Sequence, residues 1–308
     1  RREPKNEMFQ KKFKVLHSVT ATVVAALAAG CATNPYVLGF AYDRVDDRLV
    51  DRFETFAEFD ASQSEWIDAR MTHWHAWHRR TQLPRYARFL SALGTRLSDG
   101  PPPSLPEIRA FATRADGLYQ SVAGCHPLTA TGAFLATLTD TQINDIEARL
   151  AERVEENGSD EVAERIDRTV SGLSRLGFSF DARARAEVAA HFARAPDIQR
   201  LRARALEAWS RQLVALLAER RAPEFGQRIE AHMGRALSLT RTAYPEQVAA
   251  NVDSWIRMLH AIVAGYDDGE RADVGERLIA LGAAVAEVSQ SGRELAPGPR
   301  LAGLGCAL

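Results

Sequence analysis

The chain has 308 residues, of which 46% are hydrophobic and 26% charged, and its formal net charge at pH 7 is −1. This length is enough for one large domain or two small ones with a sizeable core. The near balance of charge leaves no basic excess with which to bind a phosphate backbone, so nucleic acid is not an expected partner.

The first predicted element is a secretory signal over residues 1–30. A short lysine-rich region is followed by an apolar stretch from Val19 to Leu27, and small residues then lead to Cys31. This order is the layout of a signal peptide. The apolar stretch is shorter than the roughly 20 residues that cross a bilayer as a helix. We interpret the residues before Met8 as an upstream extension.

The end of this segment, Ala29-Gly30-Cys31, resembles a bacterial lipobox, although Leu27 lies one position further from the cysteine than is usual. The resemblance implies cleavage before Cys31, diacylglycerol on its sulfur and acylation of the new amino terminus. Several acyl chains on one residue give a stable membrane anchor. Because Ala32 rather than aspartate follows, the resemblance implies the bacterial outer membrane, with the protein facing the periplasm. An ordinary secretory signal and a buried N-terminal helix remain the alternatives.

Removal of residues 1–30 changes the composition of the chain. That segment carries all the lysines, six basic residues in total and two acidic ones, so 33 basic and 38 acidic residues remain and the net charge becomes −5. The absence of lysine from the mature chain is consistent with a GC-rich genome.

Export permits a disulfide between the two remaining cysteines, Cys125 and Cys306, but free thiols remain an alternative.

The mature chain is predicted to be all-α, an elongated array or bundle of amphipathic helices and helical hairpins. Residues 31–44 form a lipidated tether, residues 45–290 a helical domain and residues 291–308 a flexible Gly/Pro-rich tail. Apolar residues recur at helical spacing, without a convincing strand-like alternation. The clearest apolar faces are Val45–Phe56, Ile143–Val154, Val162–Leu173, Ile198–Leu216 and Val248–Val263.

Helix boundaries are marked by turn and capping residues. The prolines at 101–103 interrupt any helix, and Ser104 with Glu107 then forms a capping box that begins the next one. A weak repeat of an apolar residue, a capping residue, two further residues and Gln or Glu marks other starts. Its copies are Phe59–Gln63, Leu138–Gln142 and Tyr266–Glu270, with a degenerate copy at Phe178–Ala182. Helix-start chemistry alone and an array of helical hairpins are both compatible with it.

Three histidines and two tryptophans are concentrated in MTHWHAWHRRTQLPRY, Met71 to Tyr86. At about 100° per residue His75 and His78 share one helix face and His73 points away from it. A structural zinc site needs four ligands and a catalytic one usually three, and arginines follow directly. We therefore expect no metal site, and expect surface or half-buried histidines packed among the tryptophans.

Pro84 is predicted to bend or end the helix near Leu83, because proline cannot donate the backbone hydrogen bond to Arg80. Aromatic and histidine side chains lie on neighbouring faces on both sides of this point. Core packing across the bend and a peptide- or lipid-binding groove are the alternatives for them. These side chains are Trp74, Trp77, His78 and Tyr86.

The stretch WHRRTQLPRY, Trp77 to Tyr86, resembles the W-H-R-x-x-E-L-P-x-Y signature of an uncharacterised family of helical bacterial lipoproteins, a domain of unknown function. The similarity extends less specifically over roughly residues 36–290. Gln82 stands where the family tends to have glutamate, so no role that requires a carboxylate is implied there. The family implies no activity. The residues singled out for binding or as part of the signature are Trp74, Trp77, His78, Arg79, Gln82, Pro84 and Tyr86.

No catalytic motif accompanies the signature. The sequence has no G-x-S-x-G, H-E-x-x-H or Gly-rich phosphate loop, so we predict no catalytic residue, no cofactor and no enzymatic activity. Leu138–Gln142, LTDTQ, resembles the L-T-x-x-Q motif of small periplasmic helical chaperones. We predict a lipoprotein that binds protein or peptide clients, chaperone-like or as an assembly factor. The alternative is a structural or scaffold envelope lipoprotein without a client, and the exposed apolar area distinguishes the two.

Overall fold

The computed structural model describes residues 34–158 and 161–291, and within these ranges the chain is helical, with no β-strand. The prediction of an all-α fold is confirmed. The predicted signal segment, Cys31 and the predicted tail beyond Ser291 lie outside the described residues.

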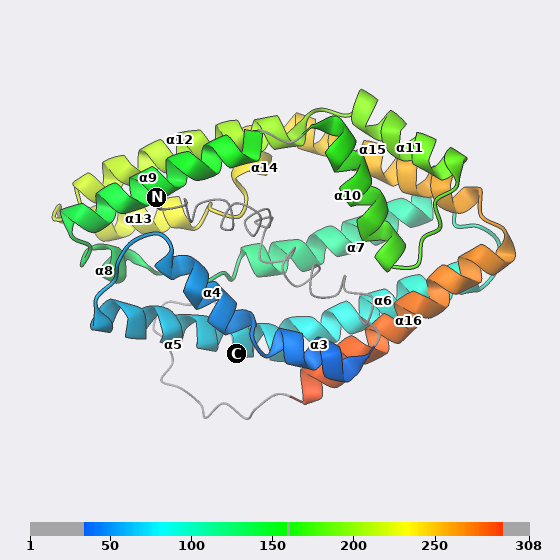
Figure 1. Ribbon diagram of the computed structural model, residues 1–308, viewed down its shortest axis with the longest axis horizontal. Coiled ribbons are helices and arrows are strands. Elements are labelled where there is room, and N and C mark those ends of the chain that lie inside the picture. The colour runs from blue at the N-terminus through cyan, green and yellow to red at the C-terminus, as the bar shows by residue number, and fades with distance from the viewer. Residues whose placement is uncertain (1–33, 159–160, 292–308) are drawn as a thin grey trace, which may run out of the picture.

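Figure 1 shows how the helices follow one another along the chain. The first group consists of α3 (Pro35–Tyr42), α4 (Val45–Glu54), α5 (Ala61–Trp77), a π-helical turn (His78–Gln82), α6 (Leu83–Ser98) and α7 (Leu105–Ala123). The second group consists of α8 (Gly132–Leu135), α9 (Asp140–Gly158), α10 (Val162–Arg175), α11 (Ala182–Arg194), α12 (Ile198–Ala218), α13 (Phe225–Met233), α14 (Leu239–Ala243), α15 (Pro245–Ala264) and α16 (Asp268–Gln290).

The last helix, α16, packs along α6 over most of the length of both, as Figure 1 shows. Small residues bring the two backbones close together. A Cβ atom on Gly275 would lie 2.6 Å from the carbonyl oxygen of Gly94, and one on Gly282 would lie 2.9 Å from that of Ala87. Because the residue numbers rise along one helix as they fall along the other, the pair is antiparallel. Larger side chains at these glycines would force the helices apart.

Three groups of buried side chains form the core. The first is enclosed by α3, α4, α5, α6 and α16 and includes Trp74 and Val285. The second lies between α9, α12 and α13 and includes Leu217. The third joins α10, α11 and α15 to the N-terminal half of α16 and includes Ile262. The core therefore follows the ring of helices visible in Figure 1, and α16 belongs to two of its three parts.

The predicted helix starts are confirmed except at the degenerate copy, where α11 begins at Ala182 and is capped by Asp181 instead of Ser179. Capping boxes open α5 at Asp60, α7 at Ser104 and α16 at Asp267. At the start of α9, the amide of Thr139 donates to Oε1 of Gln142 and the amide of Gln142 donates to the Thr139 hydroxyl, at 2.9 and 3.2 Å. Each cap satisfies backbone amides that have no partner within their own helix.

Two copies of the repeated helix start meet in space. Gln63 of α5 and Gln142 of α9 face one another, and Nε2 of Gln142 donates to Oε1 of Gln63 at 2.7 Å. The reverse bond, from Nε2 of Gln63 to Oε1 of Gln142, is 3.3 Å long. Nε2 of Gln142 also donates to the carbonyl of Glu58 at 2.8 Å. The repeat thus serves as a buried junction between the first and second groups of helices.

Candidate functional site

The site is built around the π-helical turn that joins α5 to α6. The wider turn spans His78–Gln82, and the amide of Leu83 donates to the carbonyl of His78, five residues back. Pro84 follows in the first turn of α6. A π-turn directly before the proline thus interrupts the α-helical hydrogen-bond pattern where a bend or helix end was predicted, and the chain continues as a helix into α6. Single π-turns within helices are frequent at functional sites.

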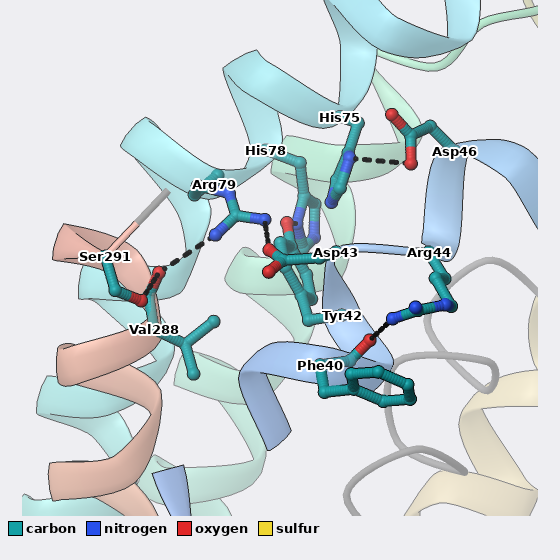
Figure 2. A network of polar contacts seen from close by, with 10 residues as sticks. All are labelled: Phe40, Tyr42, Asp43, Arg44, Asp46, His75, His78, Arg79, Val288 and Ser291. Carbon is teal, nitrogen blue, oxygen red and sulfur yellow. Dashed lines mark hydrogen bonds and ion pairs between the residues drawn. The ribbon is translucent and has the colours of Figure 1, made fainter. Parts of the chain in front are cut away.

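His78 lies at the centre of a buried hydrogen-bond network, seen from close by in Figure 2. Its Nδ1 is 2.8 Å from the hydroxyl of Tyr42, and its Nε2 is 3.2 Å from the hydroxyl of Tyr86. The residue is 2% exposed. Burial, with smaller contributions from His75 and Arg79, lowers the pKa of His78 to about 3. The imidazole is therefore neutral at physiological pH, with one ring nitrogen donating and the other accepting.

The two tyrosines of this network also stay uncharged. Burial raises the pKa of the Tyr42 phenol well above its usual range, and burial raises the pKa of Tyr86 to about 12. A neutral network in a water-excluded position can hold helices in a fixed geometry because each unmade hydrogen bond would be costly there.

Arg79 connects the two ends of the described chain. Its Nη2 lies 2.5 Å from Oδ1 of Asp43, at the end of α3, and its Nη1 donates to the carbonyl of Val288 in α16 at 3.2 Å. Its guanidinium also lies over the ring of Tyr42, 4.7 Å from the centroid. Figure 2 shows Arg79 between Asp43 and Val288. We refer to His78, Arg79, Tyr42, Asp43 and Tyr86 together as the His78 network.

His75 extends this region toward α4. Its Nδ1 lies 3.3 Å from Oδ1 of Asp46, and its ring is 4.6 Å from that of Tyr42, centroid to centroid. Burial would raise the pKa of Asp46, but the hydrogen bond and charge of His75 outweigh burial and hold this pKa below its usual value. The expectation of surface or half-buried histidines is wrong for His75 and His78, which are both buried. Helices α3 and α4, which precede α5 in the chain, fold back over that face of α5.

The remaining signature residues are mostly buried too. Trp74 is 0% exposed and donates from Nε1 to the carbonyl of Cys125 at 2.9 Å. Trp77 belongs to the same core, and Gln82 is buried and accepts from Nη1 of Arg85 at 3.2 Å. Core packing, one of the two alternatives, accounts for these contacts, whereas a groove would need accessible tryptophans.

Sequence reasoning missed Tyr42, Asp43 and Asp46 as partners of the signature. Tyr42 is the last residue of α3, Asp43 follows it and Asp46 lies in α4, and hydrophobic periodicity does not show which helices meet. Cys125 is buried and disulfide-bonded. A pairing with Cys306, which the sequence leaves open, concerns a residue outside the described ranges.

Among the described residues, no group of three or more His, Cys, Asp or Glu side chains could hold a metal ion. No helix in residues 34–158 and 161–291 is long and apolar enough to cross a membrane. A cavity of about 330 Å³ lies away from the His78 network, between α10, α11, α12 and α15, and is lined by Arg165, His191, Phe192 and Trp255 among others.

A protein-family model described as a family of unknown function (DUF6279) matches residues 55–244. The matched region includes the whole signature, but neither α3 nor α16, which supply its partners Tyr42 and Val288. No curated protein and no solved structure matches the chain.

Proposed function

The chain belongs to DUF6279, a family of unknown function. From the N-terminal sequence and the packing of α3, we propose that it is a periplasm-facing lipoprotein of the bacterial outer membrane that binds protein partners without chemistry of its own. Its anchor is the lipid on Cys31. The family signature would then have a structural role, which is to connect the anchored end of the chain to the helical body.

The observation that carries this proposal is the position of the His78 network. Asn34, which caps α3, lies only three residues after Cys31. Tyr42 and Asp43 at the other end of α3 are bound by His78 and Arg79. A lipid anchor restrains a protein only as firmly as the anchored segment is joined to the rest of the chain. The network joins that segment to α5 and α16 together.

The distribution of exposed apolar side chains favours a lasting scaffold over a client chaperone. A chaperone that holds an unfolded client protein needs one contiguous apolar surface to bind it. Outside α3, the large apolar residues that are strongly exposed in the described chain lie singly on three different helices: Val162 on α10, Val252 on α15 and Ile279 on α16. The LTDTQ motif, which resembles a chaperone motif, makes its contacts within the protein, since Gln142 is buried and donates to Gln63.

Substitution of the lipid-bearing cysteine tests the anchor. Cys31→Ala should leave an unprocessed or soluble protein, because the acceptor sulfur is absent. Ala32→Asp keeps the sulfur and serves as the matched control, and it should keep the lipid but move the protein to the inner membrane. Both are measured by membrane fractionation and by the mass of the N-terminal peptide. A Cys31→Ala protein that still fractionates with the outer membrane would refute the anchor.

The scaffold function is tested by partner capture in the envelope. Crosslinking in intact cells, followed by identification of the adducts, should give the same one or few protein partners at constant ratio. A client chaperone should instead give many partners and should suppress light scattering by an aggregating protein near equimolar amounts. Suppression of this kind would favour the client function.

A further inference from the structure

Helix α3 is apolar on all sides although only one side is covered. Its sequence, PYVLGFAY, contains no charged residue. Leu38 and Tyr42 are buried in the first core, with Gly39 close to Val288 of α16. A helix that is apolar all round is normally buried all round. The outer side of α3 therefore lacks a covering partner in the described structure.

The outer side of α3 carries three large apolar side chains on one face. Tyr36 is 83% exposed, Val37 43% and Phe40 62%. Phe40 lies three positions after Val37 and four after Tyr36, so its side chain is next to both on the helix surface. They include the two most exposed large hydrophobic residues of the described chain, and both of these are aromatic. We call these three side chains the α3 outer face.

The place of α3 in the chain indicates what covers this face. Asn34 lies three residues after Cys31, and three residues of extended chain span at most about 11 Å. If Cys31 carries the lipid of the proposed function, the start of α3 cannot be far from the membrane surface. Aromatic side chains are favoured at the headgroup level of a bilayer, where an apolar ring with a polar edge is well solvated.

The charges around the α3 outer face suit a phospholipid surface. Arg44 places its guanidinium 3.6 Å from the centroid of the Phe40 ring and donates from Nη1 to the Phe40 carbonyl at 3.0 Å, as Figure 2 shows for the hydrogen bond. An arginine at the rim of an apolar face can bind lipid phosphate while its stem contacts the apolar surface. Two neighbouring carboxylates are already engaged, Asp43 by Arg79 and Asp46 by His75.

We propose that the α3 outer face docks into the headgroup region of the phospholipid membrane that holds the anchor, with Tyr36, Val37 and Phe40 in contact with lipid. This inference rests on the proposed function, because the lipid on Cys31 brings α3 to the membrane. Anchor and helix then give two points of attachment. Since the His78 network holds α3 rigidly, docking sets the orientation of the entire helical body relative to the membrane.

Photocrosslinking of the full chain in intact cells tests the docking. The variant Phe40→p-benzoylphenylalanine carries a photoreactive side chain on the α3 outer face, and Val252→p-benzoylphenylalanine is the control on an exposed position of α15. After irradiation, the adducts of the two labelled peptides are identified by mass. We expect a phospholipid adduct at position 40 with a yield at least tenfold above that at position 252.

Each other outcome overturns the inference. A protein adduct alone at position 40 would show that a second copy or another protein covers α3, and no adduct would show a face open to water. Equal lipid adducts at both positions would show unspecific labelling. The mass of the peptide that begins at Cys31, from the same sample, separates the two proposals. An unacylated Cys31 refutes the proposed anchor, whereas an acylated Cys31 without lipid at position 40 refutes only the docking.

Discussion

At the scale of single residues, His78 is held neutral by its surroundings. Both ring nitrogens contact tyrosine hydroxyls, and burial lowers the pKa of His78 to about 3. The unfolded chain has an ordinary histidine pKa near 6.5. Between these two values the unfolded state binds more protons than the folded state. The stability that comes from keeping His78 neutral is therefore present above about pH 6.5 and is lost as the pH falls toward 3.

We predict an acid-sensitive fold whose sensitivity depends in part on His78. Between pH 7 and pH 5, His78 alone should lower the free energy of unfolding by ~2 kcal/mol. His78→Asn should reduce the fall in stability by about this amount, as measured by urea unfolding at the two pH values. Tyr86→Phe, which keeps the imidazole buried, should retain the acid sensitivity of the wild type. Equal sensitivity in the wild type and His78→Asn would contradict the prediction.

At the scale of helices, local and distant features differ in how well the sequence predicts them. The caps at Asp60, Ser104 and Asp267 were predicted correctly because a capping residue bonds amides within its own first turn. The pairing of Gln63 with Gln142, and of α6 with α16, could not be predicted, because hydrophobic periodicity gives a buried face without naming its partner. The signature residues were identified by their resemblance to a family pattern, which is also local in sequence, and the residues they bind were missed.

The contact between α6 and α16 gives a prediction about glycine. Gly275→Ala should lower the free energy of unfolding by about 2–4 kcal/mol, because the new Cβ would lie 2.6 Å from the Gly94 carbonyl oxygen and 2.8 Å from the Ser98 amide nitrogen. Gly117→Ala in α7 is the matched control. Nothing lies within 4 Å of its added Cβ, so better helix propensity should leave it neutral or stabilised by up to ~1 kcal/mol. Thermal or urea unfolding of both variants checks the pair, and a neutral Gly275→Ala would show that the helices separate at little cost.

At the scale of the whole molecule, the first and last described helices lie side by side. Helix α3 packs on α16, and Arg79 binds Asp43 at the end of one and Val288 in the other. Figure 1 shows both helices at the same side of the molecule, opposite α9 and α12. In the proposed docking, α3 and the adjoining end of α16 would face the membrane, and α9 and α12 would lie away from it.

Loss of the Arg79 contacts should loosen these two helices selectively. Arg79→Ala should cost about 1–2 kcal/mol and speed amide hydrogen exchange in residues 35–42 and in the last turns of α16. Exchange in α9 and α12 should not change, since they lie in a different part of the core. Arg80→Ala, at the exposed neighbouring position, should leave all four helices as in the wild type. A uniform increase in exchange after Arg79→Ala would contradict a local role.

The late position of α16 has a consequence for how the chain acquires its structure. Synthesis proceeds from the N-terminus, so α6 is made long before α16. The small-residue face of α6 that packs against α16 therefore stays exposed until most of the domain has been made. Two of the three parts of the core become complete only when α16 has been made. A chain that stops before Asp268 would therefore leave both parts incomplete, with apolar surface open to proteases and to other nascent chains. The packing of this one helix therefore decides whether two of the three parts of the core are closed.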